Sequence, residues 1–133
     1  MTASRSISRV RVRYAETDTM GVVYYANYLV WFEVARTDLL RAGGSTYRQM
    51  ELDGIALPVV EAHCTYKQSA KYDDEIEIRT VGAVMSPVRV QFTYEVLRAA
   101  DQALLATGHT VHASVGRDGR LRRLPDRIKA LFS

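Results

Sequence analysis

The feature that most constrains the fold of this chain is an apolar segment of helical period between residues 24 and 42. Its stripe comprises Tyr24, Tyr28, Trp31, Phe32, Ala35, Leu39 and Ala42. Leu29, Val34 and Leu40 widen that stripe, so we expect a helix that is apolar around most of its circumference and is buried by its own domain. At 1.5 Å per residue this helix would be about 28 Å long, roughly the length of a small domain. Gly43 and Gly44 then end it.

Most of the remaining sequence alternates with period two, which predicts strands that each bury one face. In residues 7–14, Val10, Val12 and Tyr14 share a face opposite three arginines. Further strands are expected at 57–69, 75–84, 88–98 and 103–115, with a short helix at 45–53 and a helical turn at 124–131. The short polar connections, including Tyr72-Asp73-Asp74, predict antiparallel hairpins.

This order predicts an α+β fold in which one curved antiparallel sheet wraps the long helix. The 133 residues suit a single domain spanning residues 1–133. The exposed remainder of the helix and an open sheet edge would favour self-association.

Composition excludes several classes of protein. No apolar run approaches the ~20 residues that span a bilayer, so we expect no membrane span. The first residues lead into no apolar signal segment, and the expected location is the cytoplasm. The one cysteine, Cys64, excludes an internal disulfide framework and a multi-cysteine zinc site, and we expect a small core residue there. His109 and His112 are three residues apart in a strand and face opposite ways, so no metal site is expected.

Basic charge gathers at the two ends of the chain. Residues 1–13 carry four arginines and no acid, and residues 117–129 carry six basic residues against two acidic ones. Such ends make nucleic acid a possible partner. However, the aromatic residues lie on the buried helix and are not interleaved with arginine on an open face, so we expect no nucleic-acid binding.

The irregular segment before the long helix is the strongest candidate for chemistry. It places Asp18 close to backbone N–H groups that have no partner within the helix, and these groups favour an anion. Asp18 is therefore either a turn residue or a carboxylate that acts on a carbonyl held by those groups. Glu33, farther along the helix, is either a paired helix glutamate or a second carboxylate of the site.

The residues around Asp18 also carry a family resemblance. The run from Asp18 to Arg36, DTMGVVYYANYLVWFEVAR, resembles the signature of the 4-hydroxybenzoyl-CoA thioesterase family, and most of all its YbgC-like branch of small acyl-CoA thioesterases. The resemblance continues through Tyr66–Ile76, Phe92–Tyr94 and Arg123–Pro125, and covers nearly the whole chain. At Tyr25 the YbgC branch usually has histidine, whereas the hydroxybenzoyl-CoA enzyme has tyrosine.

The resemblance implies a hotdog fold, a dimer or tetramer with active sites at the subunit interface, and hydrolysis of an acyl-CoA thioester without metal or cofactor. Asp18 would be the nucleophile or general base. The backbone N–H of Tyr25 would bind the thioester oxygen, with Gly21 and Val22 beside the substrate. A thioester on an acyl carrier protein is an alternative substrate, and a non-catalytic hotdog module that binds acyl groups, CoA or a protein is the alternative function.

If the substrate is an acyl-CoA, the basic ends could bind the phosphates of CoA instead of a nucleic acid. Arg89 and the run of Arg120, Arg122 and Arg123 are the candidates for that role. The alternative is that these arginines are only solvated.

Overall fold

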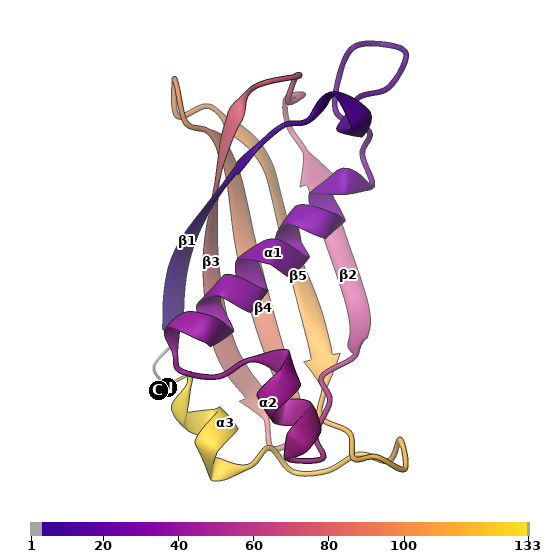
Figure 1. The fold of residues 1–133 in the computed structure, drawn as a ribbon, viewed down its shortest axis with the longest axis vertical. Coiled ribbons are helices and arrows are strands. Elements are labelled where there is room, and N and C mark those ends of the chain that lie inside the picture. The colour runs from indigo at the N-terminus through magenta and orange to yellow at the C-terminus, as the bar shows by residue number, and fades with distance from the viewer. Residues whose placement is uncertain (1–3, 133) are drawn as a thin grey trace.

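The computed structural model describes residues 4–132, and in this range a long helix lies diagonally across one face of a curved, five-stranded sheet (Figure 1). All neighbouring strands are antiparallel, and their order is β1-β3-β4-β5-β2. The strands are β1 (Ser4–Arg11), β2 (Val59–Tyr66), β3 (Glu75–Ser86), β4 (Arg89–Arg98) and β5 (Leu104–Ala113). The helices are α1 (Asn27–Ala42), α2 (Tyr47–Leu52) and α3 (Asp126–Ala130), and a 3-10 turn covers Tyr14–Glu16.

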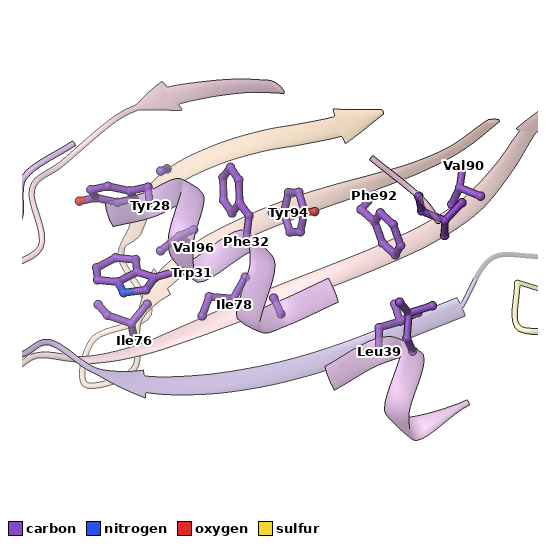
Figure 2. Packing of buried hydrophobic residues seen from close by; sticks show 14 of the residues in the cluster. Tyr28, Trp31, Phe32, Leu39, Ile76, Ile78, Val90, Phe92, Tyr94 and Val96 are labelled. Carbon is purple, nitrogen blue, oxygen red and sulfur yellow. The ribbon is translucent and has the colours of Figure 1, made fainter. Parts of the chain in front are cut away.

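The buried stripe of α1 forms the core against the concave face of the sheet (Figure 2). Phe32 stacks on Tyr94 of β4 with ring centroids 4.1 Å apart, and Trp31 and Leu39 are also buried. Phe32 also lies directly over Gly108, where an added Cβ would be only 2.6 Å from its ring. Each large side chain buried in this way stabilises the fold by about 1.5–3 kcal/mol.

The start and the burial of α1 differ from the sequence prediction. The helix begins at Asn27 and not at Tyr24, and within the chain only one face of it is buried. Leu29, Val30 and Val34 on the opposite face are 41%, 49% and 37% exposed. The expectation that its own domain covers most sides of the helix is therefore wrong, because a single sheet covers only one side of a cylinder.

Two further expectations need correction. Tyr14 does not extend the buried face of β1: it lies in the 3-10 turn and is exposed. The connection through Asp73 and Asp74 is not a hairpin, because β2 pairs with β5 while β3 pairs with β1 and β4. The reason is that β2 ends at Tyr66, which leaves residues 67–74 to cross the end of the sheet.

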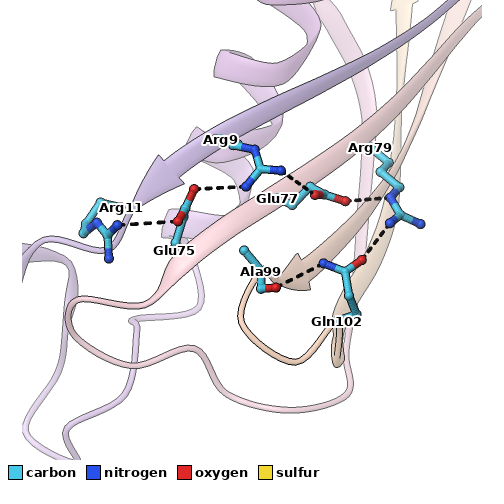
Figure 3. Close-up of polar contacts among 7 residues, drawn as sticks. All are labelled: Arg9, Arg11, Glu75, Glu77, Arg79, Ala99 and Gln102. Atoms are coloured by element: carbon cyan, nitrogen blue, oxygen red, sulfur yellow. Dashed lines mark hydrogen bonds and ion pairs between the residues drawn. The ribbon is translucent and has the colours of Figure 1, made fainter.

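Two arginines of β1, Arg9 and Arg11, pair with glutamates of β3 (Figure 3). Arg9 contacts Glu75 at 3.1 Å and Glu77 at 3.3 Å, and Arg11 contacts Glu75 at 3.5 Å. Glu77 is buried and also receives the guanidinium of Arg79 at 2.8 Å. Acidic residues of the sheet thus neutralise part of the basic N-terminal segment.

His112 is buried in the core, whereas His109 lies on the outer face of the sheet and pairs with Glu61, so the two histidines do face opposite ways. His112 Nδ1 lies 2.9 Å from the Leu57 carbonyl oxygen, and Nε2 lies 2.9 Å from the hydroxyl of Thr110. Burial lowers the pKa of His112 to about 4. The unfolded chain, with a histidine pKa of about 6.5, therefore binds this proton more tightly than the folded chain does.

Stability should accordingly fall as the pH decreases from about 6.5 to about 4, with His112 contributing up to about 3 kcal/mol of the loss. Urea unfolding at several pH values in this range measures the slope of the free energy of unfolding against pH. In His112→Gln the slope should become shallower, whereas His109→Gln should keep the wild-type slope. Equal slopes in His112→Gln and the wild type would contradict this assignment.

Candidate functional site

Asp18 lies in a tight turn between the 3-10 turn and α1. The Gly21 N–H donates to the Asp18 carbonyl oxygen at 3.0 Å, and the Asp18 N–H donates to the Val22 carbonyl oxygen at 2.8 Å. Gly21 has a φ of +78°, which glycine adopts without the steric cost of a Cβ. The turn is therefore closed at both ends and holds Asp18 in one position.

The Asp18 carboxylate is anchored through one of its oxygens. Oδ1 accepts the N–H of Met20 at 2.8 Å and that of Val22 at 3.4 Å, which orients the side chain as in an Asx turn. Among residues 4–132 no donor contacts Oδ2. The side chain is half-buried, so this second oxygen is available to a reacting group.

The start of α1 presents unused backbone donors. The Tyr24 N–H donates to the Glu16 carbonyl oxygen at 2.8 Å, and the Asn27 N–H donates to the Tyr24 carbonyl oxygen at 2.9 Å. In the part of the chain that the structure describes, the N–H groups of Tyr25 and Ala26 donate to no protein acceptor. These groups stand at the positive end of a 16-residue helix, where they can stabilise an anion.

Asp18 and the start of α1 border an open groove of about 330 Å³. The opposite wall is the end of β2 with the segment that follows it. The lining is mostly aliphatic and aromatic, with one carboxylate and one amine. It consists of Asp18, Met20, Val22, Val23, Tyr25, Tyr28, Tyr66, Lys67, Gln68 and Ser69.

Tyr66 joins the two walls of the groove. Its hydroxyl donates to the Tyr25 carbonyl oxygen at 3.0 Å, and its ring packs edge-on against Tyr25 and Tyr28. Burial, and to a lesser degree the contact with Cys64, raises the pKa of Tyr66, so the hydroxyl keeps its proton at neutral pH. Tyr66 is thereby a fixed donor that orients the first peptide groups of the helix. Cys64 itself is half-buried and packs against the core, as expected.

The structure brings together some of the residues predicted for the site. Asp18, Val22 and Tyr25 line the groove, and Gly21 shapes the turn that carries Asp18. Glu33 is exposed on the outer face of α1, does not line the groove, and forms no ion pair with any residue in the range 4–132. It is therefore neither the paired glutamate nor the second carboxylate of this groove in a single chain.

The candidate CoA-binding arginines lie at the other end of the sheet. Arg89 is opposite Ala113 at the end of β5, whereas Tyr66 is opposite Ala106, seven residues earlier. At about 3.3 Å per residue this separation is about 23 Å. Arg122 and Arg123 lie with Arg89, since the Arg122 N–H donates to the Ser114 carbonyl oxygen. One chain does not bring these arginines to the Asp18 groove.

Sequence reasoning left one buried acid of this region without a role. Glu16 is buried, and its carboxylate accepts hydrogen bonds from the backbone of Arg13 and the indole of Trp31. Neither contact follows from a periodic pattern, because both depend on how the turn folds back on α1. The groove residues Tyr66 to Ser69 were recognisable only as part of the block that carries the family resemblance.

Among residues 4–132, no group of three or more histidine, cysteine or acidic side chains is placed to hold a metal ion. The helices of this range are also too short or too polar to cross a membrane.

Comparison with known proteins supports a single family. The profile of the thioesterase-like superfamily matches residues 12–132. The acyl-CoA thioesterase YbgC of Haemophilus influenzae is 32% identical over 126 residues, which cover 92% of this chain and 90% of that protein. The DHNA-CoA thioesterase of Staphylococcus aureus is 37% identical with a TM-score of 0.85, covering 90% of this chain and 80% of that one.

A 4-hydroxybenzoyl CoA thioesterase structure has a TM-score of 0.89 at 22% identity, covering 98% of this chain and 99% of that one, and shows the same fold. The hotdog fold and the thioesterase resemblance predicted from the sequence are confirmed. A profile match over most of the chain, together with a relative that is 32% identical over 92% of it, shows that the protein belongs to the thioesterase-like superfamily.

Proposed function

We propose that the protein hydrolyses an acyl-CoA thioester to a free acid and CoA in the groove between Asp18 and the start of α1. By homology to the YbgC enzymes it is an acyl-CoA thioester hydrolase. The observation that supports this site is one groove holding a carboxylate beside helix N–H groups that have no protein acceptor. Thiol release from aliphatic and aromatic acyl-CoAs tests the proposal: steady turnover supports it, and binding without turnover indicates a non-catalytic module.

The Tyr25 N–H is the donor that we assign to the thioester carbonyl oxygen. Negative charge grows on that oxygen when the carbonyl carbon is attacked, so a fixed donor at the positive end of α1 stabilises the transition state more than the substrate. One donor of this kind typically contributes about 3–4 kcal/mol. No metal or cofactor is needed for this step.

Asp18 can act by either of two mechanisms, as a nucleophile or as a general base. Its carboxylate attacks the carbonyl carbon, the carbon–sulfur bond breaks, CoA leaves as a thiolate, and water then hydrolyses the mixed anhydride. Alternatively, Asp18 takes a proton from a water molecule that attacks the same carbon. A thiolate leaves readily, so neither route requires a strong general acid.

The phosphates of CoA require cations. Among the groove residues of one chain Lys67 is the one cation, and the predicted arginines lie at the other end of the sheet. A second copy of the chain supplies them if two β2 strands pair edge to edge. The edge of β1 carries arginines, which disfavour pairing, whereas β2 exposes Val59, Val60 and Tyr66. The exposed face of α1, formed by Leu29, Val30 and Val34, would extend the same interface.

Two-fold pairing of β2 strands is antiparallel, because each copy must present the same surface to the other. The end of β2 at Tyr66 then lies beside the partner's Val59. The partner's Arg89, Arg122 and Arg123 come from that end of the sheet, next to the Asp18 groove. A homodimer built in this way has two complete sites, and a tetramer made of two such dimers keeps them. An acyl group on a carrier protein would enter the same groove.

Tyr66→Phe tests the link between the walls of the groove. Loss of the hydroxyl bond to the Tyr25 carbonyl oxygen should lower kcat/KM by about 2–10-fold, the value of one neutral hydrogen bond. The fold should remain intact because the ring is retained. Tyr72→Phe removes the hydroxyl of an exposed tyrosine outside the groove and should keep wild-type kinetics. Wild-type kcat/KM in Tyr66→Phe would contradict the proposed role of this bond.

A further inference from the structure

Glu16 is a buried acid that ties the Asp18 turn to α1. Its side chain is only 7% exposed. Oε2 accepts the indole N–H of Trp31, in the second turn of α1, at 3.2 Å, and Oε1 accepts the Arg13 N–H at 2.8 Å. The Arg13 guanidinium lies 3.6 Å from Oε1 and supplies the opposite charge from the surface. Both oxygens of this carboxylate are therefore engaged, each by a different part of the chain.

The backbone of Glu16 makes a second connection to the helix. Its carbonyl oxygen accepts the Tyr24 N–H at 2.8 Å and the side-chain amide of Asn27 at 2.9 Å. Tyr24 directly precedes Tyr25, and Asn27 is the first residue of α1. One residue thus fixes the chain on both sides of the Tyr25 N–H while lying two positions before Asp18.

A carboxylate is a costly group to bury for packing alone, since its desolvation must be offset by charge and hydrogen bonds. The start of α1 also lacks a side-chain cap, because its N-cap residue, Ala26, makes no capping hydrogen bond. The four hydrogen bonds to Glu16 leave the N–H groups of Tyr25 and Ala26 free, and they join the two elements from which the site is built.

We infer that Glu16 is a positioning residue, which holds the Asp18 carboxylate at its working distance from the Tyr25 N–H. Glu16 does not line the groove, so it acts on the reaction through Asp18 and not by contact with substrate. This inference rests on the proposed function. Misplacement of a reacting group by about 1 Å can reduce a rate about 100-fold, so loosening this connection should affect the chemical step more than substrate binding.

The test is Glu16→Gln in the full-length protein. The substitution keeps the shape of the side chain, but its amide nitrogen must face either the Trp31 or the Arg13 donor. We expect kcat to fall about 10–100-fold while KM for acyl-CoA stays within about twofold of wild type. In the Asp18→Asn background the same substitution should change the residual rate by less than about twofold, because no carboxylate is left to position.

Glu77→Gln is the matched control for lost stability. Glu77 is also buried, its carboxylate also contacts two groups, the guanidiniums of Arg9 and Arg79 (Figure 3), and it does not line the groove. Both variants should have a lower Tm than wild type, but Glu77→Gln should keep wild-type kcat. Asn27→Ala is a second test in case Glu16→Gln does not fold. It removes one hydrogen bond to the Glu16 carbonyl oxygen, and alanine is favourable in a helix at that position. Asn27→Ala should also lower kcat, but by a smaller factor than Glu16→Gln.

The inference is wrong if Glu16→Gln and Asn27→Ala both keep wild-type kcat. It is also wrong if Glu16→Gln lowers the rate by the same factor in the wild-type and the Asp18→Asn backgrounds. Either result leaves the proposed function of Asp18 intact. A kcat loss of the same size in Glu77→Gln also overturns it, because general destabilisation then explains the effect. Wild-type turnover in Asp18→Asn overturns the proposed function, and this inference with it.

Discussion

Asp18→Asn is expected to lower kcat at least about 100-fold while the protein remains folded. Asparagine keeps the shape of the side chain, and its amide oxygen can still accept the N–H groups of Met20 and Val22. It cannot attack a carbonyl or take a proton from water at neutral pH. The measurement is steady-state thiol release from the best acyl-CoA substrate, with circular dichroism and Tm to verify the fold.

Asp101→Asn provides a control for the replacement of a turn aspartate, although Asp101 also pairs with Arg98. Asp101 also accepts the N–H of the residue two positions ahead, Ala103, at 3.1 Å, and lies in a turn outside the groove. Its replacement should leave turnover unchanged. If Asp18→Asn retains more than about a tenth of wild-type turnover with its fold intact, the assignment of Asp18 is wrong.

A single turnover in oxygen-18 water tests whether Asp18 attacks the carbonyl carbon. Label found in the Asp18 carboxylate by peptide mass spectrometry requires a mixed anhydride, since only that intermediate exposes the side-chain carbon to water. Label confined to the product acid excludes hydrolysis of an anhydride at the Asp18 carbon. Activation of water gives this result, and so does an anhydride hydrolysed at the acyl carbon.

Mixing two inactive variants is expected to restore part of the activity. Asp18→Asn and the combined Arg89→Ala/Arg122→Ala/Arg123→Ala variant should each have low turnover at substrate concentrations below KM. In a two-fold dimer whose sites combine Asp18 of one chain with the arginines of the other, half the dimers of an equal mixture are mixed and contain one intact site. The mixture should therefore regain about a quarter of wild-type turnover after subunit exchange.

Native mass spectrometry of the mixture verifies that the chains have exchanged. Mixed dimers without recovered turnover would show that the arginines do not act across the interface. Wild-type KM in the arginine variant alone would show that they do not bind CoA at all.

Periodicity predicted the core well because packing follows it directly. Phe32 and Leu39 fall on one face of a 3.6-residue repeat, and that face is the buried one. The position of Asp18 beside the helix start also followed from the sequence, because an irregular acidic segment preceded a long apolar one.

Other features depend on long-range folding and left no periodic signal. The apolar pattern runs on through Tyr24 and Tyr25, and Ala26 is no typical N-cap, so the helix start was placed too early. The burial of Glu16 depends on Trp31, 15 residues away, and no local rule predicts a buried acid there. The separation of Arg89 from Asp18 required the strand register.

If a partner chain completes the site as proposed, the open edge of β2 would make activity depend on protein concentration. Within residues 4–132, β2 is an edge strand that no other strand pairs with on its outer side, and Val59 and Val60 are exposed there. If the partner chain completes the site, dilution below the dissociation constant of the dimer lowers the specific activity of every chain, although no residue has changed. Cellular abundance would then regulate this enzyme more than linearly, because doubling the number of chains more than doubles the number of complete sites.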